Sequence, residues 1–223
     1  VTQSHLRFGK NPIRSTYLVK TADFIACHNQ AYIKLYDILG DIKEGGTFLL
    51  NCEWDSLAQL EAELPASVKR ALVERKVNFY TINATKIAAD LGLGNRTNSV
   101  LQSAFFKLAD IIPIDDAVKY MKDAIYNSYI KKGEAIVNMN YAAVDAGLTG
   151  LKKIEVPSSW KDAQDQEKTE KEAPEFIKKV VYPMTALEGD NLPVSAFSGR
   201  EDGHFESGTA AYEKRGVAAS VPK

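Results

Sequence analysis

Short apolar runs alternate with longer helical patterns from the start of the chain to about residue 156. The runs are rich in Phe, Ile, Leu, Val and Tyr, a composition that is typical of strands. Two of them, 24–27 and 47–50, lack polar alternation, which indicates strands that are buried on both faces of a parallel sheet. The expected strands cover 3–8, 14–19, 23–27, 47–52 and 78–83.

Helical patterns lie between these runs and after them, with apolar residues spaced by three and four. The first pattern ends at Gly40, the second is interrupted at Pro65, and Pro113 begins the fourth. The expected helices cover 30–39, 56–76, 100–112, 114–125 and 136–151. We therefore predict an α/β fold, with a layered, mostly parallel sheet flanked by helices and followed by an extended irregular connector.

Composition changes after residue 156, so we divide the chain into domains 1–156 and 157–223. Residues 158–175 are almost wholly polar and predict a linker or a solvated surface arm. A short helix is expected over 175–188, with a break at Pro183. The Gly-, Ser- and Pro-rich tail that follows has few apolar residues, so we expect it to wrap over another surface.

Total charge and hydropathy exclude several classes of protein. The net charge of −1 gives no overall attraction to nucleic acid or to an anionic membrane, and neither partner is expected. No apolar run approaches the roughly 20 residues of a membrane helix. The chain opens on Val1 without a signal-peptide profile, and we interpret it as a piece of something longer.

Two cysteines, Cys27 and Cys52, lie in apolar, strand-like segments. They are expected to be buried thiols in a reducing cytoplasm, because a disulfide framework uses more cysteines and places them in loops. Cys27 and His28 are adjacent in a strand and point to opposite faces, so they cannot form a nucleophile–base pair. His28 and Asn29 are expected to cap the following helix. No metal site and no catalytic residue is predicted.

The stretch GLGNRTNSVLQSAFF, residues 92–106, gives the clearest indication of a ligand. Two glycines and a polar run lead into an apolar helical stripe, and N–H groups at a helix start favour anions. Arg96 adds a forked cation. One capping side chain suffices there, so the surplus predicts an anion site, with capping alone as the alternative. The stretch is not a dinucleotide fingerprint, since the third glycine is absent and a helix precedes it.

A second basic group lies near the N-terminus. His5 and Arg7 share one face of an expected strand, and Lys10 and Arg14 follow it. Such a group can hold a carboxylate, a phosphate or a neighbouring stretch of backbone. The alternative is an edge hairpin with a solvated basic face.

Several segments together resemble one family, the large multidomain pyruvate:ferredoxin (flavodoxin) oxidoreductases. Residues 1–156 resemble their gamma-type domain without its first strand and Gly-rich loop, and the later residues resemble the connector that carries an EKR motif, here Glu213–Lys214–Arg215. The segments, in order, are SHLRFG, PIRSTYLV, ADFIACHN, GGTFLLN, GLGNRTNSVLQSAFFKLA, AVKYMKDAIYNSYIKKGEAIVNMN, AAVDAGL and TAAYEKRG.

The resemblance implies oxidative decarboxylation of pyruvate to acetyl-CoA by a cytoplasmic homodimer. Thiamine diphosphate with Mg and 4Fe-4S clusters would lie in other domains of the same enzyme, and electrons would pass to ferredoxin or flavodoxin. The fragment alone is expected to be inactive. Its role would be to help form the CoA side of the active-site chamber and to connect to the iron–sulfur domain.

Residue by residue, the CoA hypothesis rests on spacing together with the resemblance. CoA carries a diphosphate and a 3′-phosphate, which suit an Asn- and Arg-rich helix start. Two alternatives stay open: a purely structural bracing domain of the same enzyme, and an independent anion- or nucleotide-binding α/β module. The predicted contacts are Asn95, Arg96, Asn98 and Gln102, with Arg7 and Arg14 as weaker candidates.

Overall fold

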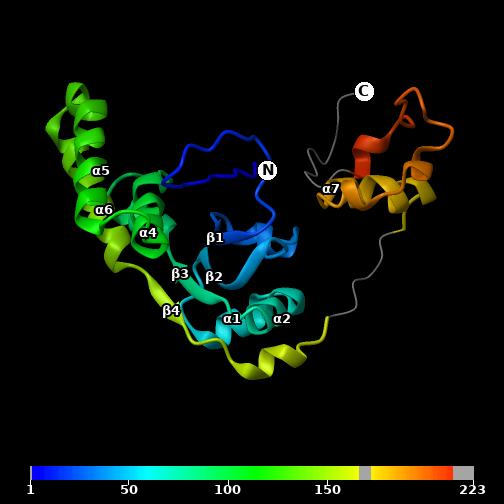
Figure 1. The fold of residues 1–223 in the computed structure, drawn as a ribbon, viewed down its shortest axis with the longest axis horizontal. Coiled ribbons are helices and arrows are strands. Elements are labelled where there is room, and N and C mark those ends of the chain that lie inside the picture. Colours follow the sequence, from blue (N-terminus) through cyan, green and yellow to red (C-terminus); the bar gives the residue numbers. More distant parts are fainter. Residues whose placement is uncertain (1, 166–171, 213–223) are drawn as a thin grey trace. The chain divides into compact units, whose positions relative to one another are not determined.

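The computed structural model describes residues 2–165 and 172–212, and residues 1, 166–171 and 213–223 lie outside this description. The predicted EKR motif at 213–215 falls in the last of these ranges. The chain divides into two compact units, Val1–Asp165 and Gln166–Lys223 (Figure 1). Each unit is described by itself.

A four-stranded sheet in the order β1-β2-β3-β4 forms the centre of the first unit (Figure 1). β1 (Ala22–Cys27), β2 (Ile42–Asn51) and β3 (Asn78–Ile82) are parallel, and β4 (Lys152–Ile154) runs antiparallel to β3. The predicted strands at 23–27, 47–52 and 78–83 are confirmed. The sequence pattern does not reveal β4, because this strand has only three residues and two of them are exposed lysines.

Alternate side chains of β2 enter different cores, which is why its sequence is continuously apolar. Phe48 and Leu50 belong to one cluster, in which the Phe48 ring stacks on Phe79 with centroids 5.5 Å apart. Leu49 belongs to another cluster. β2 is therefore buried on both faces, as predicted for 47–50, whereas the prediction is wrong for 24–27, because β1 lies at the sheet edge and Ala26 is exposed.

The Phe48 cluster includes residues of α1 (Leu57–Glu63), α2 (Ala66–Glu74) and η3 (Ser158–Asp162). α1 begins at a capping box formed by Ser56 and Gln59. Trp160 of η3 is only 2% exposed, and Arg70 of α2 hydrogen-bonds the Ala163 carbonyl. Of the two predicted alternatives, a linker is wrong for 158–165, because Trp160 anchors this segment to α2, whereas most of its polar side chains are exposed, as in a surface arm.

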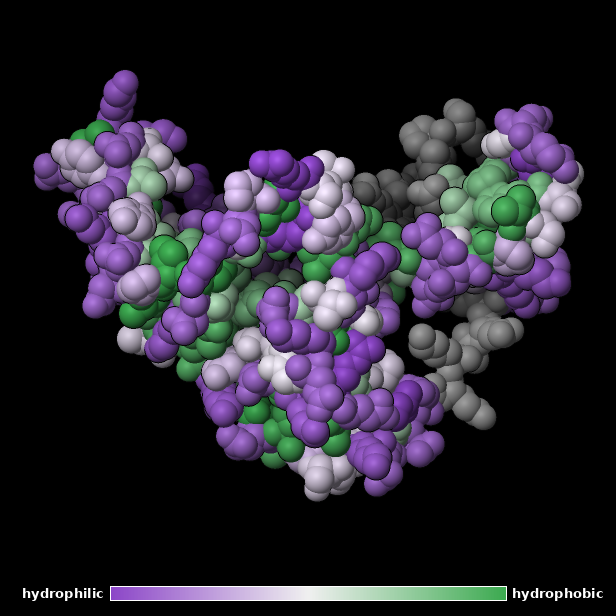
Figure 2. Space-filling model, in the orientation of Figure 1, coloured by the Kyte–Doolittle hydropathy of each residue, from purple (hydrophilic) through white to green (hydrophobic). Residues whose placement is uncertain are grey.

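The Leu49 cluster includes residues of α3 (Ala84–Asp90), α4 (Asn98–Ala109) and α6 (Glu134–Thr149). α5 (Ile114–Tyr129) packs beside α4 and α6. α4 and α6 approach closely at Gly147, where an added Cβ would collide with the Val100 carbonyl and the Ser103 hydroxyl. On the face shown in Figure 2, hydrophilic residues cover much of the surface and hydrophobic residues gather around α4.

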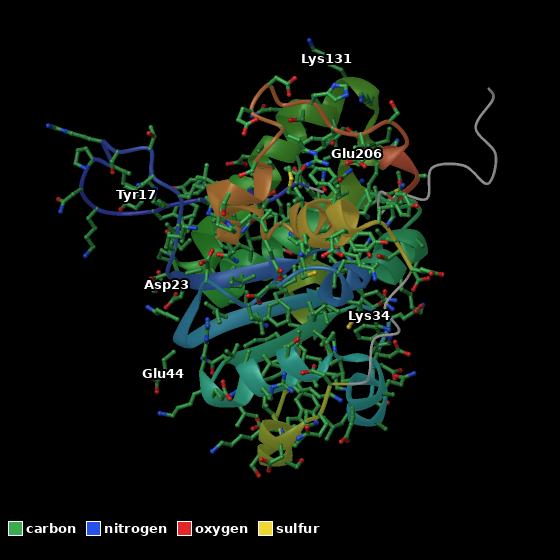
Figure 3. The ribbon with its side chains drawn as sticks, turned by 90° about the vertical axis from the view of Figure 1, so that its right-hand side faces the viewer. Tyr17, Asp23, Lys34, Glu44, Lys131 and Glu206 are labelled. Carbon is green, nitrogen blue, oxygen red and sulfur yellow. The ribbon has the colours of Figure 1, made fainter. Side chains whose placement is uncertain are left out.

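The predicted strands 3–8 and 14–19 are wrong. Residues 2–21, here called the N-terminal arm, form no strand, and no backbone group in the arm bonds another backbone group of the described chain. Figure 3 shows the arm, with Tyr17 on it, standing out from the sheet. Its residue types favour strands, but no neighbouring strand pairs with it in the described residues.

The predicted helix over 30–39 is also wrong, since only a 3₁₀ segment, η1 (Gln30–Lys34), forms there. The three buried side chains Ile33, Tyr36 and Leu39 are spaced by three residues. Only Ile33 lies in this 3₁₀ segment, whereas Tyr36 and Leu39 lie in the bends that follow it.

Short helical segments make up the described part of the second unit. Residues 175–185 are continuously helical, with a π-helical turn, η4 (Ile177–Val181), leading into α7 (Tyr182–Thr185). Pro183 does not break the helix as predicted, because the wider turn before it accommodates a residue without an N–H. The following turns are η5 (Gly189–Asn191), η6 (Val194–Phe197) and η7 (Thr209–Tyr212).

The tail of the second unit folds back on this helix, where Phe205 packs edge-to-face on Phe176 with ring centroids 5.2 Å apart. In the part of the chain that is described, no helix combines the length and hydropathy needed to cross a membrane.

Candidate anion-binding site

The turn between α3 and α4 places a polar segment at the start of a buried helix. We call residues 92–102 the α4 entrance. Gly92 and Gly94 have positive φ values of 77° and 62°, which glycine adopts without strain. Leu93 between them is buried and donates its N–H to the Ala88 carbonyl at 2.8 Å. This bond holds the turn against the end of α3. The sequence predicts a helix before the turn but does not give its bounds.

Capping does not account for the polar residues at this helix start. The N-cap of α4 is Thr97, and no side chain accepts a hydrogen bond from the first turn. Helices that begin with Ser56, Asn83 or Asn29 do receive such a bond in the same unit. The alternative that capping explains the surplus is therefore wrong, and the first-turn N–H groups of α4 have no side-chain acceptor among the described residues.

The predicted contact residues share two properties at this entrance: their side chains are exposed, and none forms a hydrogen bond or ion pair with another described residue. Asn98 and Gln102 lie one turn apart on the same face of α4. The set is Asn95, Arg96, Asn98 and Gln102.

Beneath these exposed groups α4 is firmly held. Val100 and Ala104 are fully buried against the sheet and α6. Ser99 donates its hydroxyl to Oδ1 of Asn140 at 3.2 Å, and Asn140 in turn donates to the Ile136 carbonyl within α6. The entrance thus combines a fixed helix start with free donors, an arrangement that can bind an anion but offers no base or nucleophile.

Asn51, which the sequence reasoning missed, organises the carboxyl ends of the three parallel strands. Its side-chain amide donates to the His28 carbonyl at 3.0 Å and accepts from the Ala84 N–H at 2.9 Å. Asn51 is buried, so these bonds satisfy a group that would otherwise be costly to bury. The only signal in the sequence is an Asn that ends a fully apolar run.

The residues next to Asn51 do not form a catalytic group. Asn29 caps η1 as predicted, accepting from the Ala31 N–H at 3.0 Å, whereas no described bond gives His28 a capping role. Desolvation lowers the pKa of His28, which favours the neutral imidazole. The chemistry available at this edge of the sheet is structural hydrogen bonding.

Both thiols are free and buried. Burial raises the pKa of Cys27, and burial raises the pKa of Cys52 to about 11, so both are protonated at neutral pH. Cys27 donates to the Asn29 carbonyl and Cys52 to the Trp54 carbonyl. Neither is a thiolate nucleophile or a ready metal ligand.

No group of three or more His, Cys, Asp or Glu residues in the described part of the chain could hold a metal ion.

In the N-terminal arm the predicted basic group is only partly assembled. Arg7 donates to the Ser15 carbonyl, and its guanidinium lies over the Tyr17 ring, 4.1 Å from the centroid. Nδ1 of His5 accepts from the Val19 N–H at 3.2 Å. Both side chains thus hold neighbouring backbone, which is one of the predicted alternatives. Lys10 and Arg14 are exposed and are not joined to them.

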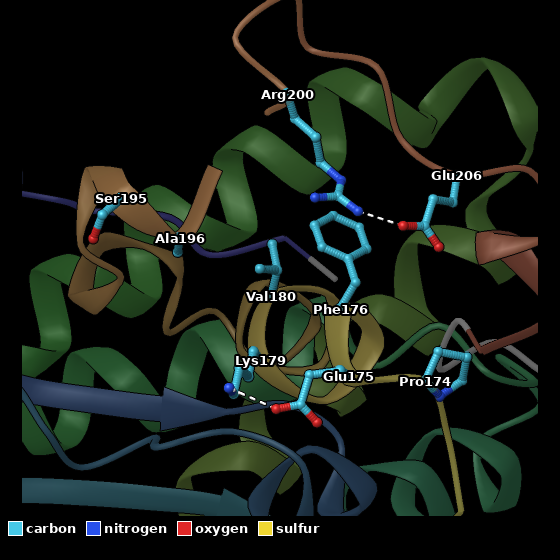
Figure 4. Close-up of a pocket in the computed structure, with 9 residues that line it drawn as sticks. All are labelled: Pro174, Glu175, Phe176, Lys179, Val180, Ser195, Ala196, Arg200 and Glu206. Carbon is cyan, nitrogen blue, oxygen red and sulfur yellow. Dashed lines mark hydrogen bonds and ion pairs between the residues drawn. The ribbon is translucent and has the colours of Figure 1, made fainter. Parts of the chain in front are cut away.

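The second unit contains a pocket of about 480 Å³ that the sequence did not indicate (Figure 4). Phe176 forms part of its wall, and the Arg200 guanidinium lies 4.0 Å from the centre of that ring. Arg200 pairs with Glu206, and Lys179 pairs with Glu175 at 2.6 Å. Since each cation has a carboxylate partner, this pocket does not offer the free positive charge that the α4 entrance has.

Comparison with known proteins shows the family to which this chain belongs. Residues 1–150 match the family described as pyruvate ferredoxin/flavodoxin oxidoreductase, and the chain belongs to that family. Residues 162–218 match a second family, EKR, described as a domain of unknown function. The predicted resemblance is confirmed.

Among individual relatives, the pyruvate-flavodoxin oxidoreductase of Enterobacter agglomerans is 54% identical over the whole chain. The pyruvate:ferredoxin oxidoreductase of Moorella thermoacetica is 53% identical, again over the whole chain. In both cases the chain spans only 19% of the relative's length. Among solved structures, subunit PORC of Thermotoga maritima pyruvate oxidoreductase is 16% identical with a TM-score of 0.49, covering 61% of this chain and 67% of that one.

Proposed function

We propose that this chain is part of a pyruvate:ferredoxin or pyruvate:flavodoxin oxidoreductase and that its α4 entrance forms part of the CoA side of the active-site chamber. Family membership and the names of the relatives support the first statement. The whole enzyme is a cytoplasmic homodimer. Thiamine diphosphate with Mg and the 4Fe-4S clusters, held in its other domains, supply the decarboxylation and electron-transfer chemistry. The second unit connects the first to the iron–sulfur domain.

The observation that carries the CoA assignment is the unpaired cation at an uncapped helix start. Between Asp90 and Asp110 the chain contains Arg96 and Lys107 and no acidic residue. Asp90 is itself paired with Lys86 at 2.5 Å. An exposed guanidinium beside open N–H groups favours the diphosphate or the 3′-phosphate of CoA.

In this proposal the residues bind and orient CoA and take no part in bond making. The Arg96 guanidinium donates two N–H groups to phosphate oxygens, while the side-chain amides of Asn95, Asn98 and Gln102 donate one each. Arg7 and Arg14 are the weaker members, since Arg7 is already engaged by Ser15 and Tyr17.

The test is a CoA titration of the full-length enzyme carrying Arg96→Ala. The KM for CoA should rise at least about tenfold, because a charge-assisted hydrogen bond contributes roughly 1.5–3 kcal/mol. Release of CO2 from pyruvate in a single turnover without CoA should be unchanged. Lys119→Ala, which removes an exposed cation from α5, is the matched control and should leave the KM for CoA unchanged. An unchanged KM in the Arg96 variant would remove Arg96 from the site.

A bracing role is the second candidate, and the exposed apolar side chains of the N-terminal arm favour it. If bracing were the whole function, the Arg96 variant would lower activity at every CoA concentration without changing the KM. The third class, a stand-alone nucleotide-binding module, requires the 223-residue chain to bind CoA or ATP alone. We expect calorimetry to show no heat of binding.

A further inference from the structure

The N-terminal arm exposes an unusual set of large apolar side chains. Leu6 is 70% exposed and Tyr17 is 65% exposed, and three more large apolar side chains of the same arm are also exposed. A cluster of this kind on one short segment indicates a surface that another protein covers. The arm's members are Leu6, Phe8, Ile13, Tyr17 and Leu18.

Side-chain contacts give the arm a definite shape although its backbone is unpaired. The bonds of Arg7 to Ser15 and of Val19 to His5 join its two limbs. The Phe8 ring lies 6.0 Å from the Phe105 ring of α4, which attaches the arm to the body of the unit. Extended backbone with free N–H and C=O groups can add main-chain hydrogen bonds to a partner, as in strand addition.

The charge of the arm restricts the chemistry of that partner. Residues 2–21 contain Arg7, Lys10, Arg14 and Lys20 and no Asp or Glu, although the whole chain carries −1. Of these cations, Lys10 and Arg14 are exposed and have no hydrogen-bond or ion-pair partner among the described residues, so their charges are available to a partner. A partner with an apolar centre and an acidic rim complements this surface.

We propose that the N-terminal arm docks on an acidic-rimmed apolar face of the same, longer polypeptide, in a part of it outside these 223 residues. The relatives support this occupant, since the chain spans only 19% of their length and most of each relative lies outside it. A partner on the same chain is present at high effective concentration, so a small surface suffices. The proposal does not depend on CoA binding.

Photocross-linking of the full-length polypeptide tests the docking. Benzoylphenylalanine is placed at Leu18 and, as a matched exposed apolar control in α1, at Leu57. Mixing isotope-labelled and unlabelled protein separates links within one chain from links between two copies. The expected product joins position 18 to a peptide outside residues 1–223 of the same chain, with no such product from position 57.

Links from position 18 only to a second copy, links only within residues 1–223, or no links would each overturn the proposal. The charge requirement is tested by Lys10→Glu combined with Lys20→Glu, which should lower the cross-link yield at least about threefold at low salt. Lys86→Glu on α3 is the control and should not change the yield. An equal yield in the double variant would contradict an acidic partner face.

Discussion

The α4 entrance and the N-terminal arm both expose cations that have no partner in the described chain, yet they are built in opposite ways. The entrance rests on α4, whose Val100 and Ala104 are fully buried, and it exposes mainly polar side chains. The arm lacks backbone pairing and exposes five large apolar side chains. A fixed polar surface suits a small anion, whereas an extended apolar and basic surface suits a macromolecular partner.

The largest expected effect on stability comes from disturbing the contact between α4 and α6, on which the α4 entrance rests. Gly147→Ala places a methyl group against the Val100 carbonyl, and backbone cannot move aside as a side chain can. We expect the free energy of opening α4 and α6 to fall by about 3 kcal/mol, the upper range of overpacking. Native-state hydrogen exchange on the full-length polypeptide measures this.

Gly9→Ala in the arm is the matched control, because an added Cβ there meets only ordinary contacts. Its opening free energies should stay within about 0.5 kcal/mol of the parent. Equal effects of the two substitutions would contradict the inference that Gly147 lies in a tightly packed contact and Gly9 does not.

A smaller effect is expected from pH at the carboxyl ends of the strands. The pKa of Cys52 is about 11 in the folded protein against 9.0 ordinarily, so the unfolded chain loses this proton first as pH rises. Stability from this thiol is present below pH 9 and declines from 9 to 11, by up to about 1.4 kcal/mol per pH unit.

Hydrogen exchange of β2 at several pH values, corrected for intrinsic rates, checks this slope, which Cys52→Ala should reduce. If the stability of the unsubstituted protein does not fall above pH 9, the Cys52 thiol is more accessible to water than its burial implies.

The smallest stability effect is expected in the arm. Leu18→Ser should change the opening free energy of the sheet by no more than about 0.5 kcal/mol, because the side chain is exposed and makes no contribution to the buried clusters. The same exchange experiment measures it. A loss of more than about 1 kcal/mol would mean that the arm belongs to the core of this unit.

The sequence predicted the part of the fold in which local pattern and tertiary partner agree. β2 was recognisable because burial on both faces leaves a continuous apolar run, and β1 and β3 were recognisable from short runs rich in Phe, Ile and Tyr. The arm has the same residue types, and strand propensity alone could not show that no described strand pairs with it. β4 is too short to leave a pattern.

Much of the candidate site was visible for a similar reason. The sequence predicts the residues of the α4 entrance because a polar run before an apolar stripe marks a helix start. The structure has a helix, α4, that begins there. The absence of side-chain caps depends on the geometry of the turn at Gly92 and Gly94, which spacing does not give. The role of Asn51 depends on three strands meeting at one edge, and only the tertiary structure brings them together.

The most direct test of the CoA assignment is hydrogen exchange of the full-length enzyme with and without CoA. We predict that saturating CoA slows exchange of the amides at residues 98–102 at least about threefold, since bound phosphate accepts from the first turn of α4. The amides of α2 should be unaffected. Unchanged exchange at 98–102, measured while CoA is demonstrably bound to the enzyme, would contradict the assignment.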